Sequence, residues 1–201
     1  EETGMVRKDG TDYLWVVDPL DGTGNFMNHN PLFAVSISLW KNGKPLLGVI
    51  EAPFLDERFT AELGKGAWHY DQRLKRKQRA SVSNVADIDE AYLVTCEGGS
   101  ADKRVTAKMF SRFYPRVREM RKLGSAALEL AWVGLGRADA YVTTEIFLWD
   151  IGAGVLFVTE AGGRVLDFKG KPYTWGKFDP LGRFNIIASN GKVFAKRLTG
   201  K

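Results

Sequence analysis

The amino-acid sequence predicts a layered fold of the α+β/α/β class, in which an antiparallel sheet is followed by alternating strands and helices. Two patterns and the composition support this prediction. Short alternating runs separated by turn residues fill about the first 90 positions, and apolar strands alternate with helical patterns after them. Hydrophobic residues make up 44% of the 201-residue chain, which is enough to bury a core and excludes disordered, collagen-like and disulfide-rich proteins.

The first part of the chain carries the signals of an antiparallel meander. The apolar run at residues 13–17 predicts a buried strand that ends at Asp18. The dipeptide Asn42-Gly43 lies between two alternating runs, which is the strongest short-range signal of a hairpin. Further strands are predicted at residues 34–40, 46–50, 58–62 and 67–70.

The second part of the chain alternates between helix and strand signals. Ser125 is the predicted N-cap of an apolar helix that ends at Gly134. Asp150 is the predicted N-cap of a helix over residues 151–161, which Gly162 stops. Strands are predicted at residues 92–95, 140–143, 164–168 and 185–189, and further helices at residues 102–113 and, as a short segment, at the end of the chain.

The charge balance and the cysteine count limit the function classes. Lys and Arg number 29 against 24 Asp and Glu, so the formal net charge is +5, which is compatible with an anionic substrate. The single cysteine, Cys96, excludes an intrachain disulfide and a thiolate metal site, and we expect a cytoplasmic protein. No apolar run reaches the ~18 residues of a membrane span, so no membrane partner is expected.

The basic segment at residues 73–79 has two interpretations. It is either a patch for nucleic acid or an acidic partner, or a solvated strand edge or loop. Because no aromatic residue is interleaved in this segment, we favour the solvated edge and expect no nucleic-acid partner.

The most informative segment delivers two carboxylates, Asp18 and Asp21, to the end of the first strand around Pro19. Carboxylates that converge there repel each other unless a cation neutralises them, and hard oxygen ligands select Mg²⁺ or Mn²⁺. Gly22 and Thr23 follow; a helix that begins there offers free N–H groups to a phosphate, and the Thr23 hydroxyl can position a water. The segment suggests metal-assisted phosphoryl hydrolysis, with an ordinary Asp-Pro-x-Asp-Gly turn as the alternative.

Two other acidic positions are candidates for the same site. Asp150 stands at a predicted helix start, where a plain N-cap is the alternative interpretation. Glu1 and Glu2 are a third source of carboxylates, although isolated residues at a chain end normally indicate nothing. The two histidines, His29 and His69, lack the spacing of metal ligands, so a histidine-based mechanism is not expected.

Together these segments resemble the inositol monophosphatase family of Mg²⁺-dependent, lithium-sensitive phosphatases. The motifs that carry the resemblance are Asp18-Pro-Leu-Asp-Gly-Thr23-x-Asn25-Phe26, Trp149-Asp150-Ile-x-Ala-Gly154 and Glu160-Ala-Gly-Gly163, with Phe59-Thr-Ala61, Gly64-Lys-Gly-Ala67 and Gly124-Ser-Ala-Ala127 between them. The resemblance implies an αβαβα sandwich of the sugar phosphatase type that lacks its first helices. It also implies an antiparallel-sheet subdomain at residues 1–118, incomplete at its N-terminus, with the first metal motif, and an α/β subdomain at residues 119–201 with the second.

The resemblance assigns a role to each matching position. It implies two or three Mg²⁺ ions, with Mn²⁺ as a possible substitute, and a bridging position for Asp18 between two of them. Thr23 and Asp18 are the implied catalytic residues, and the Thr23 hydroxyl helps to orient the attacking water. The implied metal ligands are Glu1, Asp18, the Leu20 carbonyl, Asp21 and Asp150. The implied phosphate-binding residues are Gly22 and Thr23, and the implied substrate-binding residues are Gly124, Ser125, Ala126, Thr143 and Asp150.

The implied activity is hydrolysis of inositol monophosphate, or of a related small polyol or sugar phosphate, by a homodimer. The alternatives are a fructose-1,6-bisphosphatase, a 3′-phosphoadenosine-5′-phosphate phosphatase and, in a different class, a non-catalytic regulatory relative. Thr143 stands where animal members have an inositol-binding Glu, and Glu145 is two residues out of register. The helical segment that precedes Glu1 in the family is absent here, so we expect the chain as written to be inactive or poorly folded.

Overall fold

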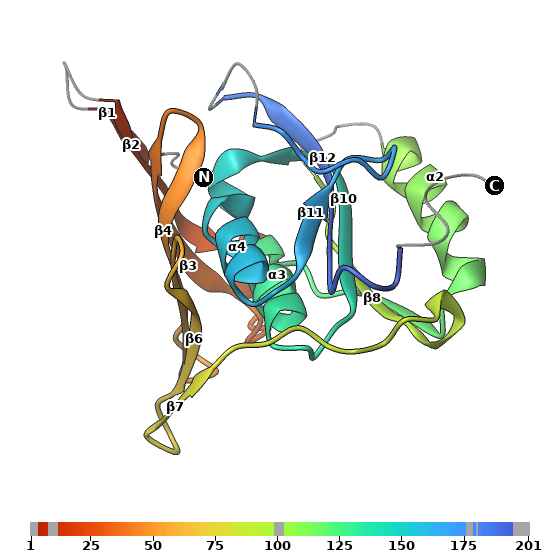
Figure 1. Ribbon diagram of the computed structural model, residues 1–201, viewed down its shortest axis with the longest axis horizontal. Helices are drawn as coiled ribbons and strands as arrows, with labels where there is room; N and C mark the ends of the chain where they lie inside the picture. Colours follow the sequence, from red (N-terminus) through yellow and green to blue (C-terminus); the bar gives the residue numbers. More distant parts are fainter. Residues whose placement is uncertain (1–3, 8–11, 99–102, 176–178, 180, 195–201) are drawn as a thin grey trace.

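The computed structural model describes residues 4–7, 12–98, 103–175, 179 and 181–194. The described elements stack in four layers: a seven-stranded sheet, a pair of central helices, a five-stranded sheet and an outer helix (Figure 1). This order confirms the predicted layered class. The helices are α1 (Thr23–Met27), α2 (Lys103–Phe113), α3 (Ala126–Gly134) and α4 (Leu148–Glu160), with the 3₁₀ turns η1 (Ile88–Glu90) and η2 (Tyr114–Arg116).

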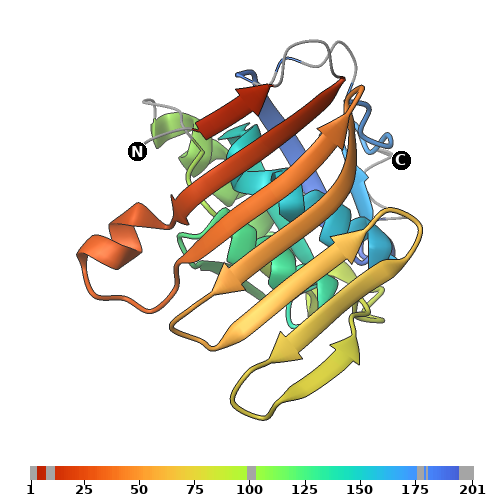
Figure 2. The same ribbon diagram turned by 90° about the vertical axis from the view of Figure 1, so that its left-hand side faces the viewer.

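The first sheet is an antiparallel meander whose strands follow one another in chain order (Figure 2), as predicted. Its strands are β1 (Gly4–Arg7), β2 (Tyr13–Asp21), β3 (Ala34–Lys41), β4 (Lys44–Ala52), β5 (Glu57–Glu62), β6 (Gly66–Asp71) and β7 (Arg76–Arg79). Asn42 and Gly43, at φ 49° and 73°, form the predicted turn between β3 and β4. The strand predicted from the apolar run at residues 13–17 is β2, and the prediction that it ends at Asp18 is wrong, because Asp21 still pairs with Ala34 of β3.

The two faces of this sheet are covered differently. In β3, every second side chain from Ala34 to Trp40 is buried, and the buried face packs against α3 and α4. On the opposite face, Trp15 pairs with Leu39 across the strands and its side chain is 45% exposed. This face is turned toward the viewer in Figure 2, where no described helix or strand lies over it.

The second sheet is mixed, with the strand order β11-β12-β10-β8-β9. Its strands are β8 (Tyr92–Thr95), β9 (Glu119–Lys122), β10 (Ala140–Phe147), β11 (Arg164–Leu166) and β12 (Arg183–Ser189). β8 pairs with β9 and β10 in parallel, whereas the other pairs are antiparallel. Strand β8 precedes residue 119 but belongs to this second sheet. The division of the chain into two subdomains at residue 118 stays a prediction. The predicted helix at the chain end lies outside the described residues.

The central helices α3 and α4 are mostly apolar because each lies between the two sheets (Figure 1), with Glu129 as a buried acidic residue in α3. They pack closely where Gly154 of α4 meets Leu130 of α3: a Cβ at residue 154 would lie 2.5 Å from the Leu130 side chain. Ser125 is the N-cap of α3, as predicted, and its hydroxyl accepts a hydrogen bond from the Leu128 N–H at 3.4 Å.

Helix α4 begins earlier than the sequence predicts. Its N-cap is Phe147 and Asp150 is its third residue, so the prediction of Asp150 as N-cap is wrong. The Asp150 carboxylate still serves the helix start, because its Oδ2 accepts a hydrogen bond from the Phe147 N–H at 3.2 Å. This is the reaching-back half of a capping box, which leaves the rest of the carboxylate available.

The basic segment at residues 73–79 forms a turn followed by β7, which is the edge strand of the first sheet. Its side chains are mostly exposed, and Arg73 forms an ion pair with Asp56 at 3.1 Å. The segment is thus an exposed strand edge, and the expectation that no nucleic acid binds to it stays a prediction. Within the described residues, no helix combines the length and apolar character required to span a membrane.

Candidate metal centre

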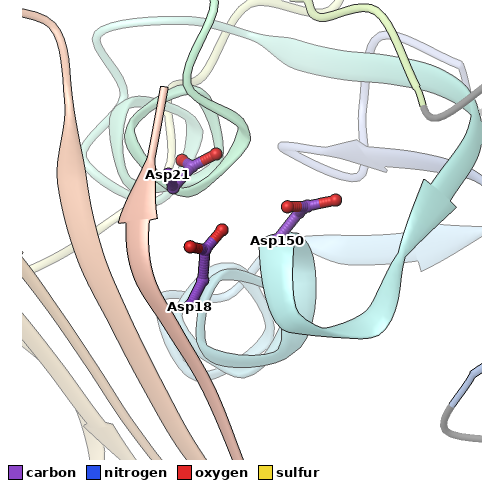
Figure 3. Close-up of side chains that lie close together, drawn as sticks. All are labelled: Asp18, Asp21 and Asp150. Carbon is purple, nitrogen blue, oxygen red and sulfur yellow. The ribbon is translucent and has the colours of Figure 1, made fainter. Parts of the chain in front are cut away.

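Three carboxylates from two elements converge at one end of the first sheet (Figure 3). Asp18 and Asp21 come from the end of β2, and Asp150 comes from the first turn of α4. One oxygen atom of each carboxylate lies within 4.8 Å of the others, and the exposed fractions of Asp18 and Asp21 are 9% and 6%. The two acidic motifs found in the sequence thus belong to a single site.

An irregularity in β2 places both of its carboxylates in that site. In a regular strand, residues three apart face opposite sides of the sheet. The register with β3 shifts between Asp18 and Asp21, where Pro19 has no N–H to donate to the neighbouring strand. Asp18 Oδ1 accepts a hydrogen bond from the Leu20 N–H at 3.0 Å, which stabilises the local turn. The Asp-Pro-Leu-Asp sequence therefore turns two carboxylates toward one side.

Asp21 is held by the N-terminus of α3. Its carboxylate accepts hydrogen bonds from Ser125 Oγ at 2.5 Å, from the Ala127 N–H at 2.7 Å and from the Ala126 N–H at 3.3 Å. The pKa of Asp21 is raised to about 7: burial raises it most and the charge of Asp18 adds to the rise, whereas the hydrogen bond from Ser125 partly opposes it. The side chain is thus fixed in position and in need of a compensating cation.

The surroundings of Asp150 also favour a compensating cation. Burial raises the pKa of Asp150 above its ordinary value, and the negative charges of Asp21 and Asp18 add to the effect. Two buried carboxylates and one partly buried one at this separation repel one another strongly when ionised, unless a cation lies between them. Oxygen atoms are the ligands that Mg²⁺ and Mn²⁺ prefer. The residues present therefore fit a hard divalent cation.

The segment after Asp21 is shaped by one glycine and one asparagine. Gly22 has φ 89°, and a Cβ there would lie 2.9 Å from the Leu32 carbonyl oxygen, so only glycine fits without strain. Asn25 Nδ2 donates to the carbonyl oxygens of Leu32 at 2.6 Å and Leu123 at 2.7 Å. Between them, these contacts fix helix α1 against the loop that precedes α3.

The Thr23 hydroxyl and the Leu20 carbonyl, two groups to which the sequence analysis assigned roles, lie together. Thr23 Oγ1 donates a hydrogen bond to the Leu20 carbonyl oxygen at 3.0 Å. With its proton engaged in this way, the hydroxyl oxygen keeps its lone pairs for a water molecule. The predicted ligand Glu1 lies outside the described residues.

The predicted substrate-binding residues are mostly buried in this structure. Ser125 and Ala126 contact Asp21, with exposed fractions of 0% and 2%. The Thr143 side chain is fully buried, and its hydroxyl lies 3.7 Å from Cys96 Sγ. Glu145 lies in the irregular part of β10 at φ 57°, where its N–H donates to Asn185. Their contacts with substrate stay predictions.

Sequence reasoning missed the groups that hold Asp21, α1 and the loop before α3. The Ala127 N–H and the Asn25 side chain were present in the quoted motifs but were given no role. Glu129 was not singled out, although a carboxylate within the apolar run of α3 was a visible signal. The contacts of Asn25 with Leu123 and of Ala127 with Asp21 join segments about 100 residues apart, which no local pattern predicts.

The comparison with known protein families identifies the chain. The family model described as the inositol monophosphatase family matches residues 1–201. The chain belongs to the inositol monophosphatase family. This agrees with the resemblance carried by the two acidic motifs and with the layered fold. Family members are Mg²⁺-dependent phosphatases, and the site formed by Asp18, Asp21 and Asp150 is a suitable place for the metal.

Individual relatives of the family are similar over most of this chain. A Thermotoga maritima protein named fructose-1,6-bisphosphatase/inositol-1-monophosphatase is 41% identical over 192 residues, which are 96% of this chain and 68% of the relative. A Xylella fastidiosa protein named Nus factor SuhB is 42% identical over 186 residues, 90% of this chain and 64% of the relative. The chain therefore spans about two-thirds of the length of these relatives.

The solved structures support the same fold. The extragenic suppressor protein suhB of Bartonella henselae superposes with a TM-score of 0.80 at 36% identity. The match covers 94% of this chain and 70% of that chain. The sandwich predicted from the sequence is thus the architecture of inositol monophosphatase family structures.

Proposed function

We propose that the chain is a Mg²⁺-dependent phosphomonoesterase that hydrolyses inositol monophosphate or a related small polyol or sugar phosphate. The observation that carries this proposal is the convergence of Asp18, Asp21 and Asp150 within 4.8 Å. A cluster of largely buried carboxylates costs free energy, and a bound divalent cation offsets this cost and attracts an anionic substrate. Membership of a phosphatase family supports the same activity.

In this proposal each residue has a separate task. Asp18, Asp21 and Asp150 hold two or three Mg²⁺ ions, together with the Leu20 carbonyl and Glu1. The bound metal supplies Lewis-acid stabilisation and lowers the pKa of water. Thr23 accepts a hydrogen bond from the attacking water, which directs an oxygen lone pair at phosphorus. The P–O ester bond breaks as the new P–O bond forms, and the alcohol leaves with a proton from water.

The remaining parts of the site serve binding. The N–H groups of Gly22 and Thr23 bind the phosphate, and the organic part of the substrate lies against Gly124, Ser125, Ala126, Thr143 and Asp150. The absence of a Glu at residue 143 favours a permissive pocket for sugar phosphates. Fructose-1,6-bisphosphatase activity is therefore an alternative, as the name of the Thermotoga relative indicates for that protein. A 3′-phosphoadenosine-5′-phosphate phosphatase is a second alternative, because it uses the same metal motifs.

A function of a different class is a non-catalytic regulatory role. It is favoured by the relative named Nus factor SuhB, which is 42% identical. The intact set of Asp18, Asp21, Thr23 and Asp150 favours an enzyme, since a regulatory protein does not need three clustered carboxylates. We further propose that the enzyme is a cytoplasmic homodimer and is inhibited by lithium.

Phosphate release by the complete protein tests the proposal. The substrates are inositol 1-phosphate, fructose 1,6-bisphosphate, 3′-phosphoadenosine 5′-phosphate and histidinol phosphate, each with Mg²⁺, with EDTA, and with Mg²⁺ plus Li⁺. We expect release that requires Mg²⁺ and is inhibited by Li⁺. The preferred substrate decides between the alternatives. No release from any substrate by a folded protein that binds Mg²⁺ would overturn the proposal in favour of the regulatory role.

A further inference from the structure

Glu129 is an ionisable residue in the middle of the apolar core. It lies in α3 with an exposed fraction of 0%, and its neighbours in that helix are apolar. Its Oε2 atom is buried and has no hydrogen-bond partner among the described residues. A buried polar atom without a hydrogen-bond partner destabilises the folded state. The presence of a carboxylate here is therefore not explained by the stability of the core.

The other oxygen of Glu129 holds the loop that leads into α3. Glu129 Oε1 accepts hydrogen bonds from the Leu123 N–H at 2.7 Å and from the Gly124 N–H at 3.2 Å. Both donors lie in the connection between β9 and α3. The carboxylate thus closes the loop back onto the first turn of the helix, directly before the N-cap Ser125.

The same loop touches both parts of the candidate metal centre. On one side, Ser125 Oγ and the following amides bind the Asp21 carboxylate. On the other side, the Leu123 carbonyl accepts the hydrogen bond from Asn25, which fixes α1. Gly124 also packs on Gly22, because a Cβ at Gly22 would lie 3.2 Å from the Gly124 carbonyl oxygen. A shift of this loop would therefore move Asp21 and the Gly22-Thr23 segment together.

We infer that Glu129 is a positioning residue of the metal centre, which holds the Leu123–Ser125 loop so that Asp21 and α1 keep the geometry needed for Mg²⁺ and phosphate. The inference rests on the proposed function and adds to it a residue that does not touch metal or substrate. Its contribution is a fixed carbonyl-like acceptor at Oε1, and a glutamine side chain supplies the same acceptor.

Three variants and one matched control separate positioning from simple core packing. Glu129→Gln keeps the acceptor, Glu129→Met fills the space without an acceptor, and Glu129→Asp keeps a carboxylate on a side chain too short to reach the loop. Val133→Ala, in the last turn of α3, removes buried apolar volume far from the loop. The measurements on the complete protein are amide hydrogen exchange without metal, thermal unfolding, Mg²⁺ affinity by titration calorimetry, and kcat and KM for inositol 1-phosphate.

We expect Glu129→Met and Glu129→Asp to speed exchange of the Ala126 and Ala127 amides, and to weaken Mg²⁺ binding about 10- to 100-fold with a matching loss of kcat/KM. Glu129→Gln should stay close to wild type. Val133→Ala should lower Tm without changing Mg²⁺ affinity. The inference is wrong if the Ala126 and Ala127 amides of Glu129→Met and Glu129→Asp exchange at wild-type rates and these variants bind Mg²⁺ with wild-type affinity. It is also wrong if Val133→Ala changes the exchange rates and the Mg²⁺ affinity as much as the Glu129 variants do.

Failure of the proposed function would look different from failure of this inference. A wild-type protein that neither binds Mg²⁺ nor releases phosphate would contradict the proposed function. The exchange rates of the Ala126 and Ala127 amides would still decide whether Glu129 holds the loop, because this measurement needs neither metal nor substrate. Should Glu129→Met fail to fold, Glu129→Asp against Glu129→Gln gives the same comparison.

Discussion

The carboxylate of Glu160, the last residue of α4, accepts a hydrogen bond from the Gly66 N–H at 2.8 Å. Its other oxygen accepts one from the Gly64 N–H at 2.9 Å, so the end of the helix clamps the turn between β5 and β6. A negative charge at a helix C-terminus is unfavourable by about 0.3–1 kcal/mol. Two charge-assisted hydrogen bonds offset this cost. The motifs that begin at Gly64 and Glu160 are thus parts of one contact.

Removal of this clamp should destabilise the protein. We expect Glu160→Ala to lower the free energy of unfolding by about 2–3 kcal/mol, because two charge-assisted hydrogen bonds are lost. Urea unfolding of the metal-free protein measures the change. The control is Glu62→Ala, which removes an exposed ion pair with Lys65 on the same hairpin and should cost less than about 1 kcal/mol. Equal effects of the two substitutions would show that the clamp does not stabilise the fold.

A pair of neighbouring glycines offers a matched test of the phosphate segment. At Gly22, an added Cβ meets the Leu32 carbonyl at 2.9 Å and the backbone is left-handed, so Gly22→Ala should cost at least about 1–2 kcal/mol and abolish activity. At Gly24, a Cβ meets nothing within 4 Å, so Gly24→Ala should leave stability and activity intact. Thermal unfolding and phosphate release measure both effects. An active, stable Gly22→Ala protein would contradict this account of the segment.

Removal of the Asp18 charge should stabilise the metal-free protein and should also remove the stabilisation by Mg²⁺. Two ionised carboxylates whose oxygen atoms lie within 4.8 Å repel by roughly 3 kcal/mol or more at an effective dielectric constant of about 20. Asp18→Asn should therefore raise the Tm of the metal-free protein, remove the rise in Tm on addition of Mg²⁺, and abolish phosphate release. Calorimetry with EDTA and with Mg²⁺ checks this. Asp56→Asn, at an exposed carboxylate paired with Arg73, serves as the control and should keep the Mg²⁺ effect. Turnover near wild type in Asp18→Asn would refute the role of Asp18.

A buried ion network away from the metal centre should govern stability in acid. Glu57 accepts hydrogen bonds from Arg137 at 2.8 and 2.5 Å and lies 3.0 Å from His69 Nε2. Burial raises the pKa of Glu57, but the hydrogen bonds and charge of Arg137, with His69, outweigh it, so the net pKa is below the ordinary value of 4.5. The folded state therefore binds fewer protons than the unfolded state near that pH. This contribution to stability is present above pH 4.5 and is lost as the pH falls through the folded pKa.

Substitution of Glu57 should remove that part of the pH dependence. We expect Glu57→Gln to cost about 2–3 kcal/mol at pH 7 and to lose less additional stability than wild type as the pH falls below 4.5. Chemical unfolding at several pH values with EDTA measures the slopes. Glu90→Gln, at an exposed position, should keep the wild-type slope. Parallel pH profiles of wild type and Glu57→Gln would show that Glu57 does not contribute to the acid transition.

The predictions that succeeded rest on local physical rules. Alternating side chains and the Asn42-Gly43 turn predicted the meander, because hairpin geometry depends on residues that are adjacent in sequence. Ser125 was recognised as an N-cap because its hydroxyl bonds within the same helical turn. The start of α4 was placed too late, since Asp150 caps from inside the first turn rather than from the position before it.

By itself, the sequence determined the alternation of elements, the family motifs and the kind of cation that Asp18 and Asp21 can bind. The family resemblance implied a common site for Asp150 with these two residues, and the tertiary structure brings the three carboxylates together. Only the tertiary structure decided that Ser125, 104 residues from Asp21, fixes the Asp21 carboxylate. The physical reason is that periodicity and capping act over a few residues, whereas this site forms where the buried faces of α3, α4 and the first sheet pack together.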